Sequence, residues 1–256
     1  MARASNREEG VKTTGTVFAI LETLQEQDGA RISDVADALD LANSTAYRHL
    51  STLAEQGYVL KEDGEYYLSM RFLRFGHYVR ERKKSYQLAA PKVAELARKT
   101  DERAEFMVEE HGRSVFVHRE VGDNAVQTDS GIGKNHPLHA TAAGKAILAY
   151  LPEDRIAEIL DRHGLEAHTD QTITDRETLF AELETVRERG VSYNKQEYIE
   201  GLRAVGVPVL APDESVIGSL SVSGPTHRLK GARFEEEIPD LLLGTANEIE
   251  LKIPYS

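Results

Sequence analysis

The sequence predicts an α+β protein with two parts, a winged helix-turn-helix followed by a linker helix and a larger domain of strands and helices. Three short helical patterns up to Gly57 are followed by a hairpin signal. From residue 104 onward, strand-like and helix-like segments are mixed, as in an α+β domain. The chain has 256 residues, which suits two domains of about 100–150 residues each.

The winged helix-turn-helix is predicted from three helices and a tight turn. Apolar residues recur at helical spacing in Val11–Gln27, and shorter helices are expected at Ser33–Leu39 and Ser44–Gln56. Two β-prone runs then flank Asp63-Gly64, a pair typical of a two-residue hairpin turn. Three helices followed by a hairpin are typical of DNA-binding domains.

The third predicted helix carries the candidate DNA-binding residues. Ser44, Thr45, Tyr47 and Arg48 lie in its first turns, off the apolar face. A recognition helix meets base edges and phosphates with these positions, and Arg48 could read a guanine or pair with phosphate. An ordinary solvated helix face would explain any one of these residues. The four together with the hairpin favour double-stranded DNA as the partner.

Residues 71–100 are predicted to be mostly helical, with Pro91 starting a separate helix at Lys92–Lys99. Phe72, Phe75 and Val79 form an apolar stripe that we expect to be buried between subunits. Beyond this region, strands are expected at 104–109, 114–120, 125–128, 191–198, 203–210 and 216–223, and helices at 141–150, 152–163, 174–190 and 235–251.

Ser219, Ser221 and Ser223 alternate with two apolar residues in one late strand, so the three hydroxyls share a face. Hydroxyl groups about 7 Å apart on one face can hydrogen-bond an oxygen-rich ligand. From this strand alone, a solvent-facing surface is the favoured interpretation.

A run of small residues, Ala142-Ala143-Gly144, is expected at the start of a helix. Small side chains let an anionic ligand approach the free N–H groups there, and the helix dipole favours negative charge. Close packing of the helix against a sheet explains the same residues about as well.

His136 and His139 have a spacing that occurs at metal sites. The chain has no Cys, and no carboxylate partner is close in sequence, so the metal-sensing alternative is disfavoured. A hydrolase is the other alternative, but the serines lack the Gly-x-Ser-x-Gly context of a nucleophile elbow. We therefore expect no catalytic residue and no enzyme activity.

Three motifs together resemble the IclR family of transcription regulators over nearly the whole chain. They are Pro137-Leu-His-Ala-Thr-Ala-Ala-Gly-Lys145, Gly201-Leu-Arg203 followed by Val207-Pro208-Val209, and Leu220-Ser-Val-Ser-Gly-Pro225. The resemblance implies a winged helix-turn-helix DNA-binding domain at 1–70, a linker helix at 71–85 and a GAF-like effector-binding domain at 86–256.

The resemblance also implies a homo-oligomer, either a dimer or a dimer of dimers. Such an assembly binds palindromic operator DNA under the control of a small organic-acid effector, and no cofactor is implied. Carboxylate-sensing relatives often carry an acid where this chain has Asn194 and a Cys where it has Ala204, so the identity of the acid is left open. The effector-binding positions that the resemblance implies are Ala142, Ala143, Asn194, Ala204, Ser221 and Ser223.

The net charge of −12 argues against a general nucleic-acid binder. Residues 1–84 carry 12 Lys and Arg against 13 Asp and Glu, whereas residues 85–256 carry 19 against 30. An acid-rich surface with 20 Arg and only 11 Lys suggests a high-salt cytoplasm, and an ordinary acidic protein is an equal alternative. The N-terminus lacks an apolar signal core, so a cytoplasmic location is expected.

Overall fold

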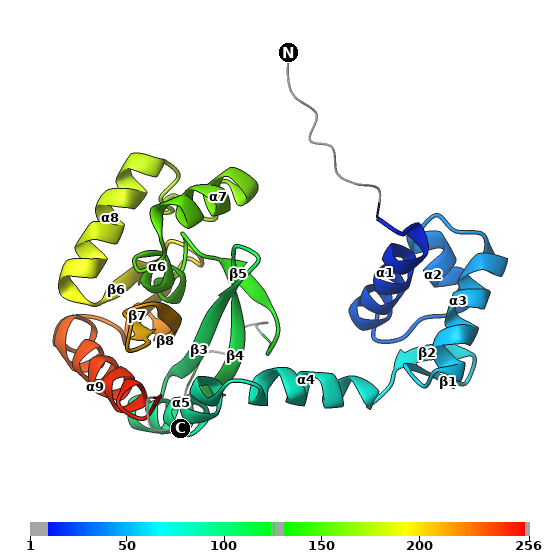
Figure 1. Cartoon of the computed structure of the whole chain (residues 1–256), viewed down its shortest axis with the longest axis horizontal. Coiled ribbons are helices and arrows are strands. Elements are labelled where there is room, and N and C mark those ends of the chain that lie inside the picture. Colours follow the sequence, from blue (N-terminus) through cyan, green and yellow to red (C-terminus); the bar gives the residue numbers. More distant parts are fainter. Residues whose placement is uncertain (1–9, 124, 126–130, 254–256) are drawn as a thin grey trace, which may run out of the picture. The chain divides into compact units, whose positions relative to one another are not determined.

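The computed structural model describes residues 10–123, 125 and 131–253, and the chain divides into two units, Met1–Val79 and Arg80–Ser256 (Figure 1). The first unit is a winged helix-turn-helix and the second is a six-stranded sheet with helices on both faces. The predicted fold class is therefore confirmed. Residues 126–128 of the strand expected at 125–128 lie outside the described residues.

The N-terminal unit packs three helices against a short hairpin. Ile20, Val35 and Leu50 are completely buried in its core. Asp63 and Gly64 both have positive φ, at 48° and 92°, which is the backbone of a type I′ hairpin turn. The elements are α1 Lys12–Glu26, α2 Ile32–Ala38, α3 Asn43–Glu55, β1 Val59–Glu62 and β2 Glu65–Leu68.

Two helices follow the hairpin, α4 Arg71–Glu81 and α5 Lys84–Thr100. The prediction that Pro91 starts a helix is wrong, because Pro91 lies inside α5 on its exposed side. The buried side of α5 is continuous across this position, from Ala89 to Val93. Burial of that apolar side outweighs the one backbone hydrogen bond that a proline removes.

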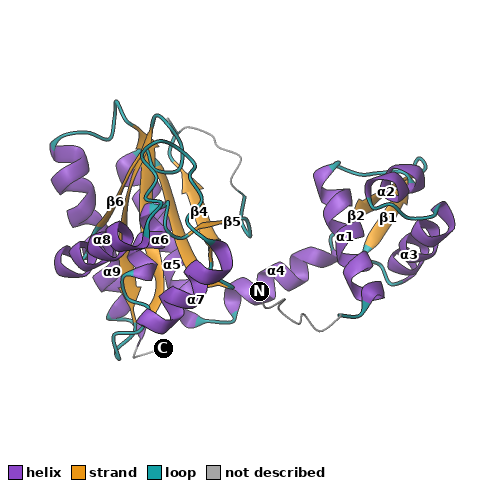
Figure 2. Ribbon diagram, turned by 90° about the horizontal axis from the view of Figure 1, so that it is seen from above, coloured by secondary structure: helices purple, strands orange, loops and turns teal. Residues whose placement is uncertain are grey.

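The second unit is built on one antiparallel sheet with the order β5-β4-β3-β8-β7-β6. The strands form a layer between helices (Figure 2). The strands are β3 Arg103–Glu110, β4 Arg113–Val121, β5 Asn135–Pro137, β6 Ser192–Lys195, β7 Leu202–Leu210 and β8 Val216–Pro225. The remaining helices are α6 Ala142–Leu148, α7 Glu153–His163, α8 Arg176–Arg189 and α9 Ile238–Glu250, the last preceded by a π-helical turn at Arg233–Glu237.

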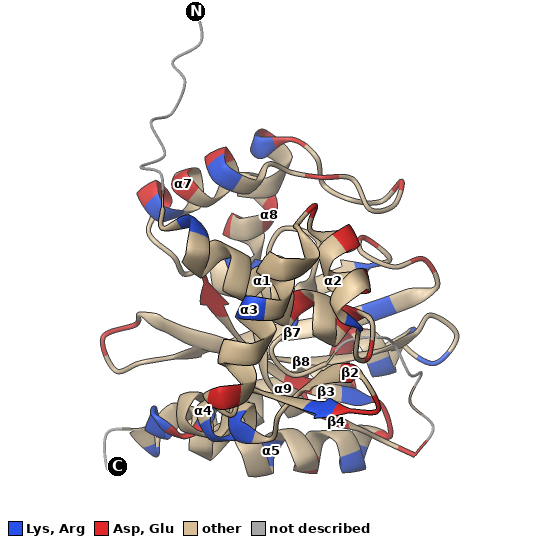
Figure 3. Cartoon of the chain, turned by 90° about the vertical axis from the view of Figure 1, so that its right-hand side faces the viewer, with Lys and Arg blue, Asp and Glu red and all other residues tan. Residues whose placement is uncertain are grey.

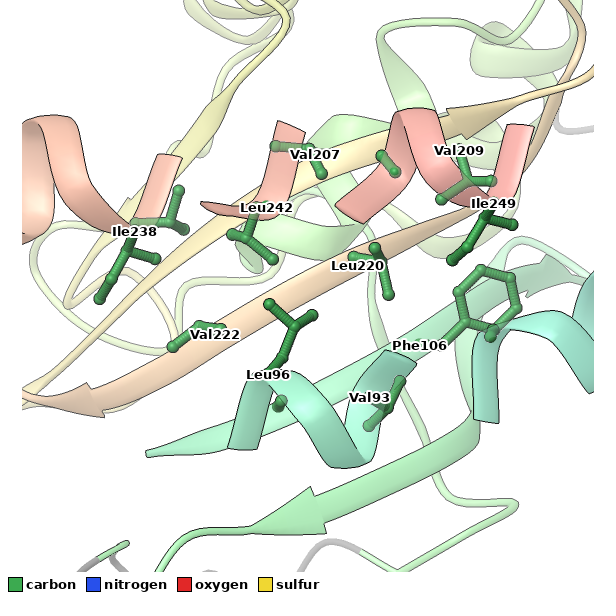
Figure 4. Packing of buried hydrophobic residues seen from close by; sticks show 14 of the residues in the cluster. Val93, Leu96, Phe106, Val207, Val209, Leu220, Val222, Ile238, Leu242 and Ile249 are labelled. Carbon is green, nitrogen blue, oxygen red and sulfur yellow. The ribbon is translucent and has the colours of Figure 1, made fainter. Parts of the chain in front are cut away.

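One face of the sheet is the main apolar core. Leu220 and Val222 of β8 pack between α5 and α9, where Leu96 and Leu242 meet them (Figure 4). Leu220 is completely buried, so its truncation to alanine would cost about 2–5 kcal/mol of stability. Because side chains alternate along a strand, the intervening residues of β8 face the other side of the sheet, toward α6.

Candidate functional site

The candidate DNA-binding residues lie on α3 away from the core of the N-terminal unit. Ala46 is completely buried, whereas Ser44, Tyr47 and Arg48 are exposed and Thr45 is half-buried. Arg48 is the single basic residue among the Lys and Arg positions of α3, whose sequence contains no Lys. The helix carries a blue band, the colour of Lys and Arg, in Figure 3. No side chain caps the start of the helix, and N–H groups at a helix start can contact a phosphate.

On the other unit, the pairing register aligns polar residues in rows across the sheet. One row runs from Arg103 on β3 to Ser223 on β8, Ala204 on β7 and Asn194 on β6. Residues that pair directly share one face of a sheet. The register therefore brings together three residues that were predicted from separate parts of the sequence.

A second row lies next to the first on the same face. Arg119 on β4 pairs with Glu105 on β3, which pairs with Ser221 on β8. Ser221 in turn pairs with Gly206 on β7, and Gly206 pairs with Ser192 on β6. Charged side chains thus stand on the β3–β4 side of this face, and small or hydroxyl side chains on the β6–β8 side.

Residues of both rows line a cavity of about 510 Å³, a volume that includes open solvent at its mouth. The structure places every predicted effector-binding residue in the cavity wall, namely Ala142, Ala143, Asn194, Ala204, Ser221 and Ser223. The wall also contains residues that the sequence reasoning did not assign to it, among them Arg103, Glu105, His136, Tyr198 and Arg203.

A buried charge cluster lies at the floor of the cavity. Arg103 Nε donates a hydrogen bond to Ser223 Oγ at 2.9 Å and also lies 2.9 Å from Glu105 Oε1. Arg119 Nε lies 3.8 Å from the same oxygen. Burial raises the pKa of Glu105 above its ordinary value, and the charges of Arg103 and Arg119 oppose that rise.

His136 forms part of the wall between two aromatic rings. Its ring centroid lies 4.8 Å from that of Phe116 and 4.8 Å from that of Tyr198. Burial, together with the charges of Arg103 and Arg119, lowers the pKa of His136 to about 4. The imidazole is therefore neutral near pH 7 and offers both a hydrogen-bond donor and an acceptor.

Asn194 lines the cavity, but its amide group is already used within the protein. Nδ2 donates to the backbone oxygen of Ala140 at 2.6 Å, and Oδ1 accepts from the backbone N–H of Glu197 at 3.0 Å. Glu197 is held in turn by the buried Lys145, whose Nζ lies 2.6 Å from Oε2. Asn194 and this ion pair position the segment that carries Tyr198 at the cavity wall.

The start of α6 approaches the sheet very closely. A Cβ atom added at Gly206 would lie 2.7 Å from the backbone carbon of Ala142, and one at Gly144 would lie 2.2 Å from the carbonyl oxygen of Leu138. Thr141 caps the helix by accepting a hydrogen bond from the N–H of Gly144. The small residues therefore serve close packing as well as lining the cavity.

His136 and His139 have separate surroundings. His139 Nε2 lies 3.0 Å from the backbone oxygen of Glu166, whereas His136 contacts the ring of Tyr198 in the cavity wall. Among the residues that the structure describes, no group of three potential metal-ligating side chains comes together. In the same part of the chain, no helix is long and apolar enough to cross a bilayer.

Comparison with known proteins assigns both units to one family. The model of the bacterial transcriptional regulator IclR C-terminal domain matches residues 79–251, and the IclR helix-turn-helix domain matches residues 17–63. The chain is 31% identical to a probable HTH-type transcriptional regulator ArcR of Halobacterium salinarum, over 98% of this chain and 97% of the relative. It is 30% identical to the HTH-type transcriptional regulator KdgR of Escherichia coli, over 96% and 94%.

Solved structures agree with this assignment. The Thermotoga maritima IclR structure aligns with a TM-score of 0.81 at 28% identity, covering 95% of this chain and 99% of that one. An IclR homologue from Microbacterium hydrocarbonoxydans, complexed with 4-hydroxybenzoate, has the same fold, with a TM-score of 0.82 at 24% identity over 95% and 99%. The resemblance that the three motifs indicated is confirmed, and the chain belongs to the IclR family of transcription regulators.

Proposed function

We propose that this regulator binds palindromic operator DNA through α3 and that an organic acid in the cavity of the second unit controls that binding. Ser44, Thr45, Tyr47 and Arg48 are the proposed DNA-contacting residues, since they lie in the first turns of α3 off its buried face. The compartment that holds the chromosome, the cytoplasm, is the proposed location.

The cavity is the observation that supports an organic-acid effector. Ser221 supplies a hydroxyl to its floor, and Arg103 and Arg119 place two cationic groups in or beside it. Hydroxyl and guanidinium groups are the usual partners of a carboxylate. The homologue solved with 4-hydroxybenzoate, itself a small acid, supports the same class of ligand.

We propose a division into a DNA-binding domain at 1–70, a linker helix at 71–85 and an effector domain at 86–256. The boundary between the two compact units lies after Val79, which is inside the proposed linker. We also propose that two or four chains assemble, because a palindromic operator requires two recognition helices about 34 Å apart.

No enzyme activity is part of this proposal. The relatives that define the family are transcription regulators. In the described part of the chain, none of the hydrogen bonds joins a serine hydroxyl to a histidine ring, and Ser223 accepts its bond from Arg103. A nucleophile activated by a neighbouring base would need such a bond.

A two-step experiment tests the proposal. First, the operator is selected from randomised duplex DNA by gel shift. Second, central-metabolite and sugar-derived acids are screened by thermal shift, where a ligand at 100 times its Kd stabilises the protein by about 2.7 kcal/mol. An acid that binds should change operator affinity by about 1–3 kcal/mol, and operator should change acid affinity equally. Failure of every acid to stabilise the protein would contradict the effector class.

A further inference from the structure

One oxygen atom on the cavity floor accepts no hydrogen bond. Glu105 Oε1 is buried, and the side chain that carries it is only 7% exposed. Arg103 Nε lies 2.9 Å away, but its single hydrogen points to Ser223 Oγ. Arg119 Nε, at 3.8 Å, is too far for a hydrogen bond. A buried acceptor without a donor costs free energy, so a ligand that supplies the donor would gain affinity.

The surroundings of this oxygen restrict the kind of donor. Two guanidinium groups already flank it, so an ammonium group would be repelled by their charges. A ligand carboxylate in direct contact with this oxygen would be repelled by the negative charge of Glu105 itself. A hydroxyl group is neutral, carries one hydrogen to donate and avoids both repulsions.

The sheet register restricts the position of that hydroxyl. Glu105 pairs directly with Ser221, which is the proposed carboxylate contact. Directly paired residues on neighbouring strands have Cβ atoms about 4.5–5.5 Å apart. A ligand whose carboxylate meets Ser221 can therefore reach Glu105 with a hydroxyl that lies one or two carbon atoms from that carboxylate.

We propose that the effector is a 2- or 3-hydroxy acid whose hydroxyl donates to the Glu105 carboxylate, which makes Glu105 the residue that distinguishes hydroxy acids from plain acids. The inference rests on the proposed function, in which the cavity takes an organic acid. It adds a residue on β3 to the positions that the sequence motifs indicate and names a narrower ligand class.

Calorimetry on the full-length protein with matched acids tests the ligand class. The probes are lactate and propionate, 3-hydroxybutyrate and butyrate, malate and succinate, and gluconate and hexanoate. We expect the tightest-binding acid to be hydroxylated and to bind at least about tenfold more tightly than its plain partner. Equal binding within that pair, or tighter binding of the plain acid, overturns this inference but leaves the proposed function standing. Absence of binding by every probe overturns both.

Substitution of Glu105 tests its role. In Glu105→Gln a negative charge leaves the floor, so affinity for the hydroxy acid should fall while affinity for its plain partner rises. A merely structural role would lower both affinities together, and that result overturns the inference. Glu109→Gln is the matched control, because Glu109 lies on the same strand and pairs with Arg155 outside this cavity.

A second variant keeps the charge and so protects the fold. Glu105→Asp withdraws the carboxylate by one methylene group while still neutralising the flanking arginines. The hydroxy acid should bind about tenfold more weakly to this variant, whereas the plain acid should bind as it does to the wild type. Unchanged affinity for the hydroxy acid overturns the proposed contact.

Discussion

Arg48 is the residue on which DNA recognition can be tested most directly, because its side chain is exposed on α3 beside Tyr47. If it reads a guanine, Arg48→Ala should weaken operator binding by about 1–3 kcal/mol and relax selectivity at one base pair. Titration of operator DNA at fixed salt measures this. Lys12→Ala is a control that removes an exposed positive charge from α1. Equal binding by wild type and Arg48→Ala would remove Arg48 from the interface.

Ser221 and Ala142 test the cavity from two sides. Ser221→Ala should cost roughly 0.5–1.5 kcal/mol of effector affinity, or up to about 3 if the bond to the carboxylate is charge-assisted. Ala142→Leu should block the site by filling it, since Ala142 is 1% exposed in the wall. Neither change should weaken operator binding by the effector-free protein. Wild-type effector affinity in Ala142→Leu would show that the ligand binds elsewhere.

His136 makes the stability of the protein depend on pH. Its pKa is about 4 in the folded protein, whereas in the unfolded chain it takes up a proton below about pH 6.5. The unfolded state therefore binds more protons between these values. The contribution is complete above pH 6.5 and is lost as the pH falls toward 4, by roughly 3 kcal/mol.

Thermal denaturation from pH 7.5 to pH 4 checks this expectation. His136→Phe should flatten the loss of stability, because a ring is kept but the titrating group is removed. Burial also lowers the pKa of His118 and His139, so part of the slope should persist. His227→Phe is the control at an exposed position. An identical slope in His136→Phe and wild type would contradict the assignment.

At the scale of elements, α4 carries several exposed apolar side chains. Leu73 is 67% exposed and Val79 is 47% exposed. The rings of Phe72 and Phe75 lie 5.6 and 6.2 Å from that of Tyr58, yet Phe75 is still 46% exposed. Of the predicted stripe, Phe75 and Val79 therefore remain available for burial between subunits, and Leu73 lies beside them.

We predict that Leu73→Glu together with Val79→Glu lowers the oligomeric state, because the charges would be buried without partners in a subunit interface. Sedimentation at micromolar concentration, with and without operator, measures it. His77→Glu, an exposed position on the same helix, should leave the assembly intact. A wild-type protein that sediments as a monomer in both conditions would defeat the prediction.

Elements with strong local signals were predictable, and those set by tertiary context were not. Asp63-Gly64 marked the hairpin because the type I′ turn needs two positive φ angles. β5 has only three residues and ends in Pro137, so it leaves no periodic pattern to detect. Arg103 and Glu105 alternate with buried apolar residues on β3, but alternation alone cannot distinguish a cavity floor from a solvated face.

The predicted effector-binding residues illustrate the same limit in three dimensions. Ser221 and Ala204 could be placed on strands from the sequence, but their approach to Ala142 depends on how α6 packs. Gly206 permits that approach, because any side chain there would collide with the backbone of α6. Asn194 donates a hydrogen bond to the backbone of Ala140, and Lys145 forms a buried ion pair with Glu197. Both contacts join residues far apart in the chain, so sequence spacing does not reveal them.

At the scale of the whole molecule, the net charge of −12 predicts a response to salt. Acidic groups that repel one another destabilise the compact state, and 1 M salt shortens the screening length to about 3 Å. The thermal midpoint should therefore rise between about 0.1 and 1 M KCl. A variant with Glu184→Lys and Glu188→Lys, both exposed on α8, should show a smaller rise. Full stability of the wild type at low salt would contradict a halophilic adaptation.

The alternation of side chains on β3 and β8 has a consequence for how this regulator can diverge. Phe106 and Leu220 point into the apolar core, while their neighbours Glu105 and Ser221 point into the cavity. A substitution at a cavity position alters the lining of the cavity without removing a core contact. Inserting one residue in either strand would instead exchange the two faces and destroy both at once. Point substitution, rather than insertion, is therefore the route by which the cavity on this sheet can change while the core is kept.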